Sequence, residues 1–453
     1  MPTRRITSAL KKHIACSANT RFREYLGGIE GLETLEKEFP GHQIANIQIL
    51  VRQFFEQEIP GAKIYGTGSR RGSLLDGCHS FNDLLQDPRI DKDGDFDGID
   101  FTNLRYVKAV PEKFDARLGL MSALTLLEYE GKRLAVYFWT ENRIQPHCTV
   151  GIACRDVASA NRLLNRFIEY LSDNSIFRKR MLLPSISFAS EVENLTITEF
   201  ERTQWEELIL PEDLKEAIHE NVIGFIKHQD VILRNGFELK RGILFHGVPG
   251  TGKSMACRVI AAELKDFTTI VMTGEDQRSP RAAFDLARRL QPALIIFEDI
   301  DNIAIRREDN SLRSVLSELM NELDGLSDRE NIYVLFTTNN IRYLEDALVE
   351  RPGRVDLIFE FPLPAPELRR KLVCLYARNA HVSINDWSAL LCRTEGTSPA
   401  FIKELVKRAL LHSIRNGGVD EQGFATLKDE HFCSALDELG KMTNASARRI
   451  IGF

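Results

Sequence analysis

The stretch of sequence that decides the fold is Gly247-Val-Pro-Gly-Thr-Gly-Lys253-Ser254. It has the spacing of a phosphate-binding loop, G-x-x-x-x-G-K-[ST]. The residues before it predict a strand ending at His246, and the residues after it predict a helix from Ser254. In that context the glycines let backbone N–H groups turn toward phosphate oxygens at a helix N-terminus. We therefore predict a nucleotide-binding site here, the alternative being a chance glycine-rich loop.

The residues of this loop have separate expected roles. Lys253 is expected to neutralise the β- and γ-phosphate oxygens of ATP, and the Ser254 hydroxyl is expected to ligate Mg²⁺. ATP and Mg²⁺ are therefore the predicted cofactors. The residues predicted to hold the nucleotide are Gly247, Val248, Pro249, Gly250, Thr251, Gly252, Lys253, Ser254 and Met255.

A buried strand that ends in carboxylates follows downstream. Residues 294–297, Leu-Ile-Ile-Phe, run into Glu298-Asp299-Ile300-Asp301. One carboxylate at the tip of such a strand can hold Mg²⁺ through water, and a second can orient or deprotonate an attacking water. The motif therefore predicts hydrolysis at the phosphate site. The alternative is a solvated acidic loop after a core strand.

Strand and helix patterns alternate around these motifs. Apolar or β-branched runs predict strands at residues 242–245, 269–272, 293–297, 332–336 and 356–361. Helical periodicity occurs between them at residues 254–264 and 312–323. Strands that are apolar throughout are typical of a parallel sheet covered by helices on both faces. The predicted fold class is α/β, with a nucleotide-binding domain over residues 205–362.

Two further domains are expected on either side. After Pro362 the strand signals stop, and amphipathic stretches at residues 366–379, 398–416 and 426–442 predict a small helical lid over residues 363–453. The loose, polar composition of residues 184–211 predicts a domain junction. Residues 1–195 are predicted to form an α+β domain that binds a protein client or partner. Its expected helices lie at 42–57 and 156–172, and its expected strands at 134–140 and 148–154.

Composition excludes several other classes of protein. The 453 residues are 43% hydrophobic and 27% charged, which is an ordinary globular mix. The formal charge of −6 gives no field that would gather nucleic acid. The 8 cysteines show no Cys-x-x-Cys spacing, which disfavours disulfide frameworks and zinc sites and favours the reducing cytoplasm. No apolar run approaches the roughly 20 residues needed to cross a bilayer, so no membrane span is expected.

With these motifs in place, residues 205–453 resemble an AAA ATPase module. Leu323-Asp-Gly-Leu326 looks like the intersubunit signalling segment, and Thr337-Thr-Asn339 looks like the end of the sensor 1 strand. Glu350-Arg351-Pro-Gly-Arg354 resembles the arginine-finger segment. The resemblance implies a homo-oligomeric ring, usually hexameric, in which neighbouring subunits share each nucleotide.

The same resemblance implies roles for the residues near the phosphates. Glu298 would hold the metal ion together with Ser254, and Asp299 would act on the attacking water. Asn339 would polarise that water.

The two arginines are the charges expected from a neighbouring copy. By the resemblance, Arg351 and Arg354 would reach the γ-phosphate of the adjacent subunit and stabilise phosphoryl transfer. The alternative is a surface turn built on Pro352 and Gly353.

Two departures from the family pattern are informative. Most members end the acidic strand with Asp-Glu, whereas this chain has Glu298-Asp299. That order is familiar in the mitochondrial AAA translocase of the Rieske iron-sulfur protein, and residues 181–184 and 337–339 are also similar to that translocase. Residues 275–281 are shorter than the pore loop of threading members and contain no aromatic residue, which disfavours processive threading.

These features together predict an ATP-hydrolysing AAA ring machine that remodels, moves or disassembles a protein client. One alternative is a nucleotide-gated oligomeric scaffold with slow ATP turnover, because the Asp299 side chain is shorter than the family's usual glutamate. A nucleic-acid remodeller is disfavoured by the acidic charge balance and by the missing pore aromatic residue.

Overall fold

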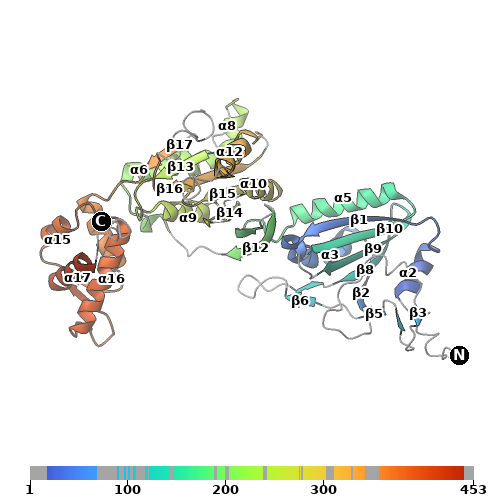
Figure 1. Cartoon of the computed structure of the whole chain (residues 1–453), viewed down its shortest axis with the longest axis horizontal. Helices are drawn as coiled ribbons and strands as arrows, with labels where there is room; N and C mark the ends of the chain where they lie inside the picture. The colour runs from blue at the N-terminus through green and yellow to red at the C-terminus, as the bar shows by residue number, and fades with distance from the viewer. Residues whose placement is uncertain are drawn as a thin grey trace. The chain divides into compact units, whose positions relative to one another are not determined.

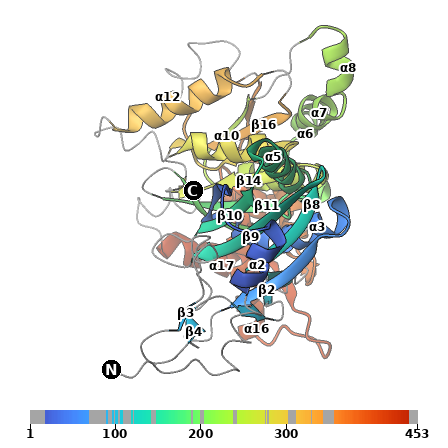
Figure 2. The same cartoon turned by 90° about the vertical axis from the view of Figure 1, so that its right-hand side faces the viewer.

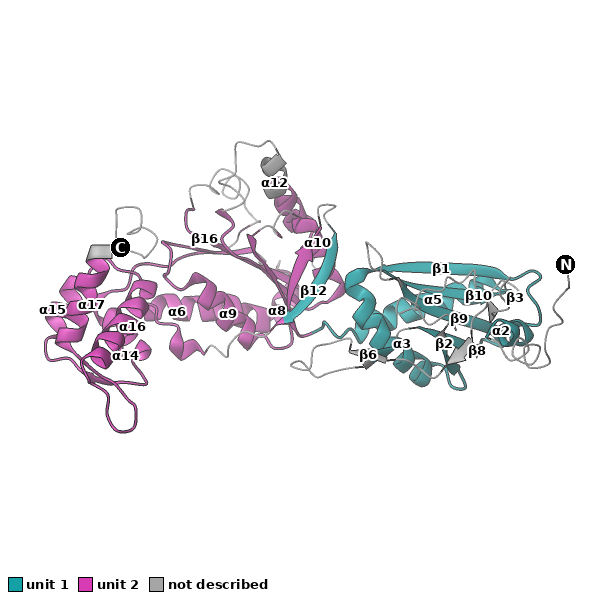
Figure 3. Cartoon of the chain, turned by 60° about the horizontal axis from the view of Figure 1, so that its bottom comes forward, with its two compact units in different colours: residues 1–178, 191–197 teal, residues 179–190, 198–453 magenta. Residues whose placement is uncertain are grey.

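The protein divides into two compact units (Figure 3). The structure is a computed structural model that describes residues 18–68, 89–90, 96–97, 100–102, 106–108, 118–120, 122–141, 147–187, 191–198, 204–237, 242–274, 276, 279–301, 311–327, 330–341, 355 and 357–442. The first unit comprises residues 1–178 and 191–197, and the second comprises residues 179–190 and 198–453.

The chain passes between the units after residues 178, 190 and 197, and the last two of these points lie within the loose stretch of residues 184–211. Residues 181–186 form strand β11 (Met181–Ile186), which pairs with β14 (Thr268–Met272) in the second unit. The pairing joins Met181 to Thr269 and Leu182 to Ile270. Residues 184–186, at the start of the expected junction, therefore belong to the end of a strand.

The first unit contains an antiparallel sheet with strand order β1-β10-β9-β8-β2-β5 (Figure 1). Figure 2 shows β10, β9, β8 and β2 of this sheet from another side. Its strands are β1 (Glu33–Pro40), β2 (Lys63–Gly68), β5 (Asp100–Thr102), β8 (Ala123–Tyr129), β9 (Lys132–Glu141) and β10 (His147–Cys154). Two short pairs join β3 (Arg89–Ile90) to β4 (Phe96–Asp97) and β6 (Tyr106–Lys108) to β7 (Leu118–Leu120).

Helices cover both faces of this sheet. The side chains of β9 point alternately to the two faces and so pack against both helical layers. Leu134 and Phe138 lie in a core shared with α3 and α5, whereas Tyr137 and Trp139 lie in a cluster shared with α2. These helices are α2 (Ala18–Leu26), α3 (Ile44–Glu58) and α5 (Val157–Asp173). The helices expected at 42–57 and 156–172 and the strands expected at 134–140 and 148–154 are all present, and the unit is α+β as predicted.

The second unit contains a parallel sheet in which the strands run in the order β11-β14-β15-β16-β13-β17 (Figure 1). Besides β11 and β14, its strands are β13 (Gly242–His246), β15 (Ala293–Phe297), β16 (Ile332–Thr338) and β17 (Leu357–Glu360). Strand β12 (Val192–Thr198) follows β11 along the chain. All five strands expected from the apolar runs are confirmed.

Helices lie on both faces of this parallel sheet, as the apolar strands predicted. Ile296 of β15 belongs to the core that contains α9, while the neighbouring Phe297 ring stacks on Phe284 of α10. The helices of this region are α6 (Glu212–Ile218), a π-helical turn (His219–Gly224), α7 (Phe225–Lys227), α8 (Gln229–Arg234), α9 (Lys253–Glu263), α10 (Pro280–Arg289) and α12 (Ser311–Asp324). The α/β fold class is therefore confirmed.

The residues after the sheet form the expected small lid around their own hydrophobic core. Its helices are α14 (Pro366–Tyr376), α15 (Trp387–Arg393), α16 (Pro399–Arg415) and α17 (Asp429–Met442). The expectation that strands end at Pro362 is wrong, because β18 (His381–Ser383) pairs with β19 (Thr426–Lys428). Within the described ranges, no helix combines the length and the apolar character that a membrane crossing requires.

Candidate active site

The loop predicted to bind phosphate lies between β13 and α9, at the carboxyl end of a parallel strand. Gly247 adopts a φ of +149°, and a Cβ built there would lie 2.4 Å from the Phe361 carbonyl oxygen. Only glycine fits that position. Gly250 and Gly252 also adopt positive φ values, which glycine reaches without strain. The turn places the N-terminus of α9 at Lys253, where backbone N–H groups attract phosphate.

Lys253 holds this loop through its ammonium group. The side chain is buried, and Nζ donates to the carbonyl oxygens of Gly247 (2.7 Å) and Val248 (3.0 Å). A third hydrogen bond runs from Nζ to Oδ1 of Asn339 at 2.9 Å. These contacts use all three donors of the ammonium group. The ammonium group of Lys253 is therefore already oriented before nucleotide binds. Phosphate oxygens would take the place of its present hydrogen-bond acceptors.

Burial also changes the proton affinity of this lysine. It lowers the pKa of Lys253 to about 8, while the nearby carboxylates of Asp299 and Asp301 act in the opposite direction. Desolvation disfavours the charged ammonium, and an anion in contact with it favours the charged form. Bound phosphate would therefore raise the pKa of Lys253 again.

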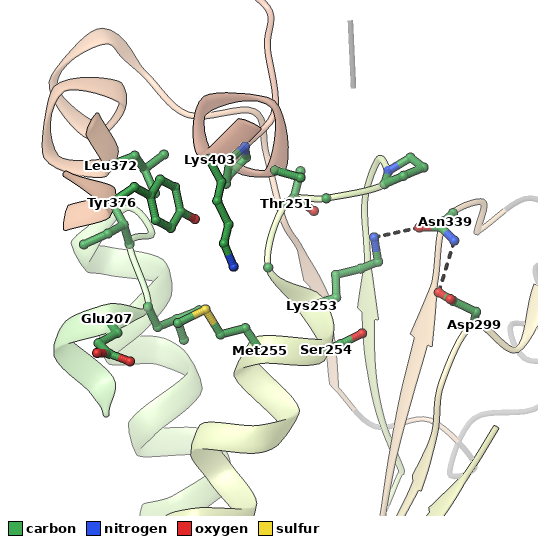
Figure 4. A pocket seen from close by; sticks show the side chains of 17 residues that line it. Glu207, Thr251, Lys253, Ser254, Met255, Asp299, Asn339, Leu372, Tyr376 and Lys403 are labelled. Carbon is green, nitrogen blue, oxygen red and sulfur yellow. Dashed lines mark hydrogen bonds between the residues drawn. The ribbon is translucent and has the colours of Figure 1, made fainter. Parts of the chain in front are cut away.

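Asn339 connects the lysine to the acidic strand (Figure 4). Its Oδ1 accepts from Lys253, and its Nδ2 donates to Oδ1 of Asp299 at 3.1 Å. Asp299 follows β15 and Asn339 follows β16, and these strands are parallel neighbours whose carboxyl ends meet at one edge of the sheet. The result is a continuous chain of hydrogen bonds from Lys253 through Asn339 to Asp299.

Asp301 fixes the position of these hydrogen-bonded side chains by accepting hydrogen bonds from residues at the end of β16. It is buried, and its Oδ1 accepts hydrogen bonds from Thr338 Oγ1 and from the backbone N–H of Asn339, both at 3.1 Å. The backbone N–H of Asp299 donates to Thr337 Oγ1 at 2.8 Å. The sequence placed Asp301 in the acidic run but assigned it no role. The structure identifies it as a positioning residue for Asn339.

A cavity of about 340 Å³ opens at this edge of the sheet. The expected site residues that line it are Pro249, Gly250, Thr251, Gly252, Lys253, Ser254, Met255, Asp299 and Asn339. Gly247, Val248 and Glu298 are not among the lining residues. The carbonyl oxygens of Gly247 and Val248 instead accept from Lys253 Nζ, and Glu298 is adjacent in sequence to the lining residue Asp299. The expected arginines, Arg351 and Arg354, lie outside the described residues.

The lid supplies the opposite wall of the cavity, which no sequence motif marked. Tyr376 and Lys403 face the cavity from the lid, across from Lys253 (Figure 4). The full set of additional lining residues is Glu207, Leu208, Ile209, Leu372, Tyr376, Pro399, Ala400 and Lys403. Ser398 caps the start of α16, but nothing in the local sequence connects that helix to the phosphate loop. The contact arises from tertiary packing, in which Ala400 N donates to Gly250 O at 3.1 Å.

The two ends of the cavity differ chemically. Leu372 and Tyr376 contribute apolar surface at one end, while Lys253, Asp299 and Asn339 give the other end charge and hydrogen-bonding capacity. A site with an apolar part and a few placed polar groups suits a nucleotide, whose base is flat and whose phosphates are anionic.

The oxygen donors also suit Mg²⁺. In phosphate sites this ion keeps several waters and uses only one or two protein oxygens together with the phosphates. The Ser254 hydroxyl and the Asp299 carboxylate both line the cavity. The donor chemistry therefore fits a magnesium ion that is held largely by the nucleotide.

The comparisons with known proteins agree with this geometry. Residues 243–363 match the model of the ATPase family associated with various cellular activities (AAA). The chain therefore carries an AAA ATPase domain, as the order of its motifs implied. The proteasome-activating nucleotidase of Aeropyrum pernix is 33% identical over 223 residues, which cover 46% of this chain and 54% of that protein. The chain thus spans about half the length of this curated relative.

Proposed function

We propose that the chain is a Mg²⁺-dependent ATP hydrolase that assembles into a hexameric ring, as is usual for AAA ATPases, and remodels, moves or disassembles a protein client. The observation that carries this proposal is the chain of hydrogen bonds from Lys253 through Asn339 to Asp299 at the charged end of the cavity. The similarity to a proteasome-activating nucleotidase supports a protein as the client. The formal charge of −6 argues against nucleic acid as the substrate.

The residues of the site divide the work of hydrolysis. Lys253 binds the β- and γ-phosphates, and Asp299 orients and deprotonates the attacking water. Asn339 lies between them and positions that water relative to the lysine. Ser254 would hold Mg²⁺ together with Glu298, which adjoins the cavity-lining Asp299 in sequence, and the bound ion would supply charge neutralisation at the phosphates.

Positive charge from a neighbouring subunit completes the site in this proposal. Arg351 and Arg354 approach the γ-phosphate of the adjacent copy, where they stabilise charge in the transition state. ATP binding and hydrolysis then change the contacts between subunits. The N-terminal unit binds the client and moves with these changes.

Several finer points belong to the same proposal. The missing aromatic residue in residues 275–281 supports action on a client without processive threading. The Glu298-Asp299 order supports a resemblance to the mitochondrial translocase of the Rieske protein. Cys148, Cys257 and the other cysteines in the described ranges are all free thiols, which favours a reducing compartment such as the cytoplasm.

A nucleotide-gated scaffold is the second candidate. It is favoured by Asp299, whose side chain is one methylene shorter than glutamate and whose φ of +51° sets an unusual direction for it. In a scaffold ATP would hold the ring closed and turn over slowly. Steady-state phosphate release separates the two, because sustained release well above one turnover per minute supports the machine.

Mixing two inactive variants tests whether neighbouring copies complete each site. Lys253→Ala should not bind ATP, and Arg351→Ala should bind ATP without hydrolysing it. In rings of equal, random composition, about a quarter of the interfaces join an intact Lys253 to an intact Arg351. Mixed rings should therefore recover about a quarter of the wild-type rate. A mixture as inactive as its components would refute completion in trans.

A further inference from the structure

A short segment before α6 is fastened to the nucleotide-binding helix. This segment, the strap (residues 205–210), begins in a 3₁₀ turn (Trp205–Glu207). Trp205 Nε1 donates to Oε2 of Glu263, the last residue of α9, at 2.5 Å. Leu208 and Leu210 are buried in the same hydrophobic core as α9. The strap is therefore held on the α/β side of the cavity.

The strap also contacts the lid. Ile209 packs against the hydrophobic core of the lid rather than that of the sheet. Glu207 forms an ion pair with Arg378, which lies just after α14 and two residues beyond the cavity-lining Tyr376. Successive residues of the strap thus face opposite sides of the cavity. Leu208 points toward the sheet, whereas Glu207 and Ile209 point toward the lid.

We infer that the Glu207–Arg378 ion pair is a latch that holds the lid over the apolar end of the cavity and sets the rate at which nucleotide leaves. This inference rests on the proposed nucleotide binding. Glu207 lines the cavity from the strap and Tyr376 lines it from α14, so the pair joins two walls of one site. Moving α14 away from the strap opens this end of the cavity, and it requires the ion pair to break.

The exposure of the pair suits it to a releasable contact. The side chains of Glu207 and Arg378 are 30% and 62% exposed, so water can replace their interaction when the lid moves. Exposed ion pairs contribute modestly and are screened by salt. The expected effect of breaking this one is an increase in the nucleotide dissociation rate of about two- to five-fold.

Stopped-flow measurement of dissociation of a fluorescent ADP from the full chain tests the latch. Glu207→Gln and Arg378→Met should each accelerate dissociation by about two- to five-fold. The exchanged pair Glu207→Arg with Arg378→Glu should return the rate toward wild type. Arg393→Met is the matched control, because it breaks an exposed ion pair with Asp437 that lies elsewhere in the lid. It should leave dissociation unchanged.

Salt dependence separates a latch from a general loss of structure. Dissociation from the wild type should accelerate as salt is raised from low concentration, and this dependence should flatten in both single variants. The latch is refuted if the single variants release nucleotide at the wild-type rate, or if the exchanged pair fails to restore it. Failure of the wild type to bind ADP would instead refute the proposed nucleotide site.

Discussion

Asp299→Asn should leave ATP binding intact and slow hydrolysis severely. The substitution keeps the shape of the side chain, and an amide oxygen at this position can still accept from Asn339 Nδ2. The backbone hydrogen bond to Thr337 Oγ1 does not involve the side chain. Asparagine also tolerates the positive φ of +51° at this position. The change therefore removes basicity and charge while it preserves the geometry.

The size of the effect follows from the role of a positioned base. Such a group contributes roughly 10²- to 10⁴-fold to a rate, which corresponds to about 3 to 5 kcal/mol of transition-state stabilisation. We expect kcat to fall within that range. The affinity for ATP should stay the same or increase slightly, because a negative charge near the phosphates has been removed.

Phosphate release at saturating ATP and equilibrium binding of a fluorescent ATP analogue measure the two effects separately. Asp285→Asn is the matched control, because it makes the same chemical change at a half-exposed carboxylate on α10 that does not line the cavity. It should retain the wild-type rate. Full turnover by Asp299→Asn would refute the assignment of the base, and loss of ATP binding would refute the claim that the geometry is preserved.

Two further predictions follow from the phosphate loop. Burial lowers the pKa of Lys253 to about 8, and phosphate binding needs the charged form of this lysine. The affinity for ATP should therefore fall by up to about tenfold per pH unit above pH 8. An ATP affinity that calorimetry finds constant over that pH range would contradict this. Gly250→Ala should weaken nucleotide binding and lower the melting temperature, because its Cβ would lie 2.7 Å from Ala400 Cβ, whereas Gly274→Ala imposes similar backbone strain in open space. Equal effects of the two substitutions on affinity would show that the contact with the lid is unimportant.

The fold of the second unit could be predicted because its signals are local. A parallel strand buried on both faces is apolar throughout, so each strand was recognisable by itself. Strands β18 and β19 have only three residues each, which is too short to show a period. Strand β11 was not predicted, because Pro184 interrupts it and its pairing with β14 uses only Met181 and Leu182.

The site divides in the same way between local and distant signals. The phosphate loop and Asn339 could be predicted because each belongs to a short, recognisable motif that directly follows a strand. Tyr376 and Lys403 carry no such motif, since they reach the cavity only when the lid packs beside the loop. Asp301 could be seen in the acidic run, but its hydrogen bonds to the β16 end depend on the strand order.

The central claim is that Lys253 binds the phosphates of ATP. Equilibrium binding of labelled ATP to the wild type and to Lys253→Met tests it most directly, because methionine keeps the length of the side chain and removes only the ammonium group. The wild type should bind ATP, and the variant should lose the three contacts that orient this position and bind far more weakly. Equal affinity of the two proteins, or no binding by the wild type, would contradict the account.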